Sequence, residues 1–190
     1  MKFFTLDVYK EEDSSKPFAA AMAAYNEHLA ALRGVLPDDL LTLAHLPGVD
    51  DGLVVKVHHV RRLKALQLTL RCGGLPMGYF DLVLNYEGIE LSPQTAWTLA
   101  RIARTTKSDS RHEHDVAYHE IDRSEAGGVT HRFLFHPGVL VQFSCQCLRW
   151  EKIARPDRTL PSLPDRFPEG PKSAAYGARK RRLRAAPSRR

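Results

Sequence analysis

The feature that most constrains the fold is an alternation of apolar and polar side chains, in runs that begin at Leu53. Leucines occupy every second position over residues 66–70, and the run from Tyr79 to Tyr86 alternates in the same way. Successive side chains of a strand point to opposite faces, so this spacing predicts strands with one buried and one wetter face. Six runs have the composition of strands, and they are Leu53–Val60, Leu63–Cys72, Tyr79–Tyr86, Asp115–Ile121, Val129–Phe135 and Val139–Trp150.

Short turn signals separate several of these runs. Gly73, Gly74 and Pro76 follow the second run, Glu125–Gly128 follows the fourth, and Pro137-Gly138 follows the fifth. Such turns join antiparallel neighbours. The sequence therefore predicts one mainly antiparallel sheet of about six strands.

Helices are predicted before the sheet and within it. Lys2–Val8 reads as a short strand or extended arm. Apolar residues then recur at helical spacing from Phe18 to Leu32, and Gly34 suits the end of that helix. Pro37 with two aspartates predicts a second short helix, and Ser92-Pro93 predicts a third. The fold class is α+β, with two N-terminal helices and one inserted helix packed on the sheet.

The charge distribution divides the chain into three parts. The formal charge is +6, but residues 171–190 carry eight Lys or Arg and no acid, which leaves −2 for residues 1–170. Prolines recur between Pro156 and Pro171 and disfavour regular structure. We predict an α+β domain over 1–153, a Pro-rich linker over 154–170 and a disordered basic tail over 171–190.

Composition excludes several classes of protein. No stretch approaches the roughly 20 apolar residues of a membrane span, and the acidic residues after Val8 are unlike a secretory signal. A cytoplasmic location is expected. Cys72, Cys145 and Cys147 form an odd and sparse set, which predicts free thiols, and the last two would share one face of a strand.

The order and texture of the chain resemble a family of small bacterial proteins known as a domain of unknown function. The resemblance covers about residues 1–150. It rests on the opening Met1-Lys2-Phe3-Phe4-Thr5, Leu36-Pro37-Asp38, the strand pair around Val54–Leu70, Tyr79–Leu82 with Tyr86–Ile89, and the closing hairpin Phe133–Phe143. The family has no assigned catalytic residues, so the resemblance transfers none, and the segment after Arg155 lies outside its pattern.

A histidine cluster is the candidate metal site. His112 and His114 stand beside carboxylates, and His119 follows. Imidazole and carboxylate ligands suit zinc, nickel or copper, and would support a metal-dependent enzyme. However, the spacing fits no common zinc module, and on a strand His119 would face away from the other two. A polar loop that leads into a strand is the competing interpretation.

Other sequence signatures give little support for an enzyme. A Cys-His nucleophile would need Cys72, Cys145 or Cys147 beside a histidine such as His131 or His136, and no local signature indicates one. The sequence holds no phosphate-binding glycine loop, dinucleotide fingerprint or Gly-x-Ser-x-Gly motif. It therefore predicts no cofactor and favours a protein without catalytic activity.

The basic tail offers a second function. Its charged residues could neutralise phosphates and give salt-sensitive, nonspecific binding of nucleic acid. Tyr176 is its single aromatic residue, so it offers little base stacking, and a solvated terminus is the alternative. The candidate residues are Arg179, Lys180, Arg181, Arg182 and Arg184.

The preferred hypothesis is a protein-interaction or immunity-type module that binds another protein. The sequence has enough apolar residues for a full core but no recognisable set of catalytic residues, and this favours the hypothesis. Nucleic-acid binding through the tail and a metal-dependent enzyme at His112, His114 and His119 are the alternatives.

Overall fold

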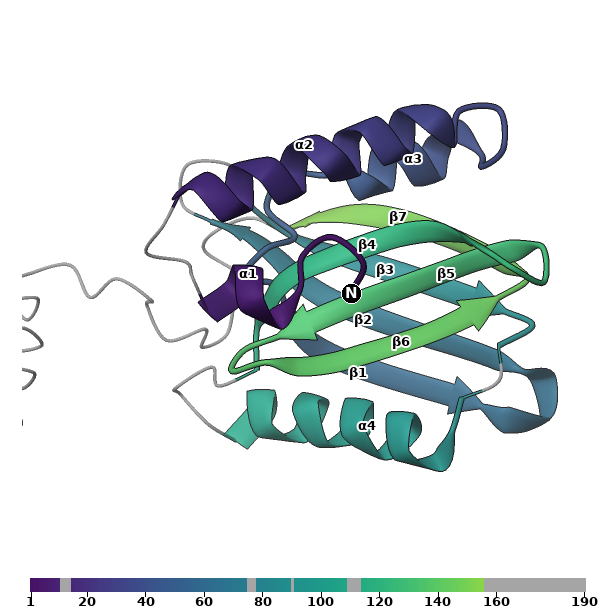
Figure 1. Cartoon of the computed structure of the whole chain (residues 1–190). Coiled ribbons are helices and arrows are strands. Elements are labelled where there is room, and N and C mark those ends of the chain that lie inside the picture. Colours follow the sequence, from purple (N-terminus) through teal and green to yellow (C-terminus); the bar gives the residue numbers. More distant parts are fainter. Residues whose placement is uncertain (11–14, 75–77, 90, 109–113, 156–190) are drawn as a thin grey trace, which may run out of the picture. The chain divides into compact units, whose positions relative to one another are not determined.

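The computed structural model describes residues 1–10, 15–74, 78–89, 91–108 and 114–155. These residues form two antiparallel sheets (Figure 1). The first has the strand order β1-β2-β3-β7, with β1 Leu53–Val60, β2 Ala65–Gly74, β3 Gly78–Glu87 and β7 Cys147–Arg155. The second has the order β4-β5-β6, with β4 Val116–Ser124, β5 Gly128–Phe135 and β6 Val139–Cys145.

The two sheets pack face to face, and the core lies between them. Tyr86 of β3 meets Phe143 of β6 edge to face, with ring centroids 4.9 Å apart. The register pairs Leu68 with Leu84 and Leu70 with Leu82, so β2 and β3 offer one continuous apolar surface. This is the buried face that the sequence alternation predicts, and its leucines are at most 2% exposed.

Helices close the two open sides of the sandwich (Figure 1). α3 contacts β4 and β7 on one side, and α4 contacts β1 and β6 on the other. Leu40 and Leu43 of α3 and Leu99 and Ile102 of α4 are buried in the core. The helical elements are α1 Leu6–Lys10, α2 Ser15–Ala31, α3 Asp38–Ala44, α4 Pro93–Ser108 and the short 3-10 helix η1 Arg61–Leu63.

The predicted helix boundaries are largely confirmed. Gly34 follows α2 with φ +75°, the left-handed conformation that glycine adopts without strain. The Ser92 hydroxyl accepts a hydrogen bond from the Thr95 backbone N–H at 3.0 Å and caps α4. Among the described residues, no helix is long and apolar enough to cross a membrane.

The prediction of one sheet with about six strands is wrong in detail. The run from Val139 to Trp150 is not one strand, because the chain passes from β6 in one sheet to β7 in the other at Gln146. Cys145 and Cys147 therefore end and begin different strands and do not share a face. β7 also continues to Arg155, two residues beyond the predicted end of the domain.

The prediction of a short strand or extended arm over Lys2–Val8 holds only for the first residues. Lys2–Phe4 is an arm, but Leu6–Lys10 is helical because Thr5 caps it. The Val8 N–H donates to the Thr5 hydroxyl at 3.4 Å, and the Tyr9 N–H donates to the Thr5 carbonyl at 3.0 Å. The cap outweighs the strand propensity of the β-branched and aromatic residues around it.

Candidate functional site

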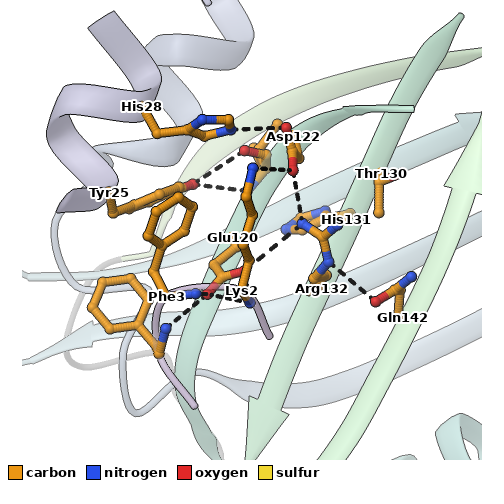
Figure 2. Close-up of polar contacts among 12 residues, drawn as sticks. Lys2, Phe3, Tyr25, His28, Glu120, Asp122, Thr130, His131, Arg132 and Gln142 are labelled. Carbon is orange, nitrogen blue, oxygen red and sulfur yellow. Dashed lines mark hydrogen bonds and ion pairs between the residues drawn. The ribbon is translucent and has the colours of Figure 1, made fainter. Parts of the chain in front are cut away.

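The outer face of the second sheet carries a connected set of polar side chains (Figure 2). Because side chains alternate along a strand, every second residue of β4, β5 and β6 points away from the other sheet. We call this set the polar face. It consists of Glu120, Asp122, Thr130, Arg132, Gln142 and Ser144.

Glu120 anchors the Lys2–Phe4 arm to the sheet. Its carboxylate accepts hydrogen bonds from the backbone N–H groups of Lys2 at 2.8 Å, Phe3 at 2.7 Å and Phe4 at 2.8 Å. Glu120 is fully buried, and the Arg132 guanidinium lies 3.8 Å from its carboxylate. Backbone donors satisfy the lone pairs that burial would otherwise leave without partners.

Asp122 holds α2 against the sheet and fixes the positions of the basic side chains near its carboxylate. It accepts hydrogen bonds from Nε2 of His28 at 2.9 Å and from the Arg132 guanidinium at 3.2 Å, and Nζ of Lys2 lies 3.7 Å away. Burial alone raises the pKa of Asp122, but the His28 hydrogen bond, the charge of Lys2 and the Arg132 hydrogen bond bring it below its ordinary value. The carboxylate is therefore ionised and fixed in position.

Tyr25 of α2 covers the free edge of β4. Its hydroxyl accepts a hydrogen bond from the Ile121 backbone N–H at 2.7 Å and lies 3.5 Å from the Ile121 carbonyl. β4 is an edge strand of its sheet, so this contact occupies backbone groups that could otherwise pair with another chain.

The polar face continues onto β6, where it is open to solvent. The Arg132 side chain donates to the Gln142 amide oxygen at 3.1 Å, and the Thr130 and Ser144 hydroxyls lie 2.8 Å apart. A hollow of about 550 Å³ lies over these residues, with Lys2 and Glu125 on its border. Leu140 stands in the same row of β6 and is 48% exposed.

The arrangement offers hydrogen bonds and charge rather than a reactive group. The His28–Asp122 pair has the form of a catalytic dyad, but no Ser, Thr or Cys side chain among the described residues hydrogen-bonds to His28. Burial raises the pKa of the Cys72 thiol, and it raises that of Cys145 to about 12, so neither is an activated nucleophile.

The structure describes two of the three histidines of the predicted metal cluster, and the two have different hydrogen-bond partners. His112 lies outside the described residues. Nδ1 of His114 lies 3.0 Å from the His136 carbonyl, whereas His119 is buried, with Nδ1 3.3 Å from Nε2 of His131. Among the described residues, no three His, Cys, Asp or Glu gather in a group that could hold a metal ion. The metal site that includes His112 stays a prediction.

The tail residues proposed for nucleic acid, Arg179 to Arg184, also lie outside the described residues. Nucleic-acid binding through them stays a prediction. The cysteines are free thiols, as expected. None of the residues named from sequence for these two sites is among the six residues of the polar face.

The sequence does not reveal the polar face, because alternation predicts only a wetter face and not that Glu120 and Asp122 are buried on it. One signal was present. Tyr118, Glu120 and Asp122 alternate along one strand, and Arg132 lies in the next. Acids and a base at matching positions of neighbouring strands indicate cross-strand ion pairs.

The site has to be interpreted from its own geometry. The chain was compared with protein-family models, with curated proteins and with solved structures. No family model, no curated protein and no solved structure matches it.

Proposed function

We propose that this chain is a protein-interaction module and that it binds its partner through the polar face. The observation that supports the proposal is that Gln142 and Ser144 of β6 are exposed beside Leu140 while hydrogen bonds to Arg132 and Thr130 of β5 hold them in place. An immunity-type role, in which the chain binds and blocks another protein, is one form of this function.

Pre-ordering of the side chains favours binding. A partner must normally fix each long side chain that it contacts, at a cost of about 0.5–1.5 kcal/mol for each one. Here Arg132 is already fixed between Asp122 and Gln142, and the exposed Ser144 hydroxyl is held by buried Thr130. A partner therefore meets groups whose positions are set before it arrives.

The residues that line the hollow over the polar face indicate what kind of partner fits. Lys2 and Arg123 offer positive charge, Glu125 offers negative charge, and Gln142 and Ser144 both donate and accept hydrogen bonds. Leu140 adds an apolar contact at the edge of this polar area. A surface of mixed charge beside an exposed leucine suits a folded protein with a complementary mixed surface.

Cross-linking from the polar face tests the proposal. A photo-reactive amino acid is placed at Gln142, and the matched control places it at His58, which is exposed on the outer face of the other sheet. In the cells that produce the chain, we expect a discrete cross-linked product from position 142 and none of that mass from position 58.

Two outcomes of the cross-linking experiment would contradict the proposal. The same products from both positions would show nonspecific contact. No product from position 142, with the protein folded and abundant, would contradict a partner at the polar face.

A further inference from the structure

A second hollow lies between α2, the end of α3 and β4, away from the open part of the polar face. It has a volume of about 180 Å³. Its walls are mainly aromatic and apolar, with Phe4 from the arm, Met22 and Tyr25 from α2, and Tyr118 from β4. An engineered apolar cavity of about 150 Å³ holds benzene, so a single substituted aromatic ring fits this volume.

A chain of buried polar groups ends at this cavity. The Tyr86 hydroxyl lies 2.9 Å from Nδ1 of His131, and Nε2 of His131 lies 3.3 Å from Nδ1 of His119. His119 lines the cavity and is 7% exposed. Burial lowers the pKa of both imidazoles, that of His119 to about 4, so both are neutral at pH 7.

The Tyr86 hydroxyl decides which nitrogens of His131 and His119 donate hydrogen bonds and which accept them. In the part of the chain that the structure describes, Nδ1 of His131 is the acceptor recorded for the Tyr86 hydroxyl, and a buried O–H without an acceptor costs about 1–3 kcal/mol. His131 therefore accepts at Nδ1 and donates from Nε2 to Nδ1 of His119. This leaves the proton of His119 on Nε2, for which no partner is recorded among the described residues.

We infer that this cavity binds a small neutral aromatic molecule that carries a hydrogen-bond acceptor, such as an alcohol or amide, and that His119 donates Nε2–H to that acceptor. The aromatic walls and Met22 suit a ring. A buried neutral donor selects a ligand with an acceptor over its hydrocarbon analogue, because the donor is otherwise left without a partner.

The border of the cavity disfavours anions. Asp50 lines it, and burial together with the neighbouring charge of Asp51 raises the pKa of the Asp50 carboxyl to about 6. At pH 7.5 that carboxyl is mainly ionised and repels a carboxylate or phosphate. A neutral ligand avoids both this repulsion and the cost of burying a charge.

The test is a titration of the full chain at pH 7.5 with benzyl alcohol and with toluene, followed through backbone amide resonances by NMR. Saturable shifts are expected around Phe4, Tyr25 and Leu46, with benzyl alcohol bound about tenfold more tightly than toluene. The variant His119→Phe should bind both probes with equal affinity. Ala44→Phe, which fills the cavity, should bind neither, whereas Ala24→Phe, on the exposed side of α2, should bind as the parent does.

Thermal unfolding shows whether each variant is folded, and Ala44→Leu replaces Ala44→Phe if the larger side chain prevents folding. Failure of both probes to bind the parent chain would overturn the inference. Retention of the alcohol preference in folded His119→Phe would overturn the role of the imidazole. Cross-linking at Gln142 is independent of this experiment, so the two proposals can fail separately.

Discussion

Replacing Glu120 with alanine is expected to lower the free energy of unfolding by about 3–5 kcal/mol, the cost typical of breaking a buried charged contact. The carboxylate is fully buried and accepts the N–H groups of Lys2, Phe3 and Phe4. Without it, three backbone donors lose their acceptor, and Arg132 loses one of its two carboxylates. Urea denaturation followed by circular dichroism measures the change.

Two further variants separate charge from shape at this position. Glu120→Gln keeps an acceptor oxygen and most of the volume, so it should cost less than the alanine variant. Glu125→Ala removes an exposed carboxylate from the turn between β4 and β5 and should change stability by less than about 0.5 kcal/mol. A similar small loss for Glu120→Ala would show that the arm is not held by this carboxylate.

Acidification from pH 7 to pH 5 is expected to destabilise the fold through His119 and His131. Burial holds both pKa values below the ordinary 6.5, that of His119 at about 4. The unfolded chain therefore takes up protons below about pH 6.5 that the folded chain does not. Their contribution to stability is complete above pH 6.5 and is lost as the pH falls toward 4, by about 2 kcal/mol for His119 at pH 5, with a loss of the same sign for His131.

Comparing the pH dependence of stability in the parent chain and in variants isolates the contribution of the two histidines. Asp50 titrates in the same range with the opposite sign, because its raised pKa makes the folded chain bind protons first. The double variant His119→Phe with His131→Leu keeps Asp50 but removes both imidazoles, so its stability should fall less between pH 7 and pH 5. His58→Gln, which removes an exposed imidazole, should follow the parent chain. Parallel curves for the parent and the double variant would contradict the prediction.

The strands and helices could be predicted because each follows from local pattern, but their assembly into two sheets could not. One signal of the second sheet was nevertheless visible. Val139, Val141, Phe143 and Cys145 lie at odd positions, whereas Leu148 and Trp150 lie at even positions. A change of phase in a period-two pattern means that the strand is interrupted, and Gln146 lies at that point.

The contacts of the site join residues that lie far apart in the sequence, and local sequence patterns do not reveal such pairs. Glu120 binds residues 2–4, and Asp122 binds His28, so both contacts join segments more than 90 positions apart. His119 and His131 meet because the register pairs Ile121 with His131, which places the two imidazoles in adjacent positions on one face. Strand texture predicts that β4 and β5 pair, but the register depends on the turn and the packing.

The most direct test of the interaction surface compares two exposed apolar residues on opposite sides of the sandwich. Leu140 is 48% exposed beside the polar face, and Ile153 is 37% exposed on the outer side of β7. The partner captured by cross-linking at Gln142 is purified and titrated against the parent, Leu140→Asp and Ile153→Asp chains by calorimetry. We predict that Leu140→Asp weakens binding at least tenfold while Ile153→Asp stays within about twofold, because a charge at Leu140 removes an apolar contact of the interface and leaves the carboxylate to be desolvated. Equal affinity of Leu140→Asp and the parent would contradict binding at the polar face.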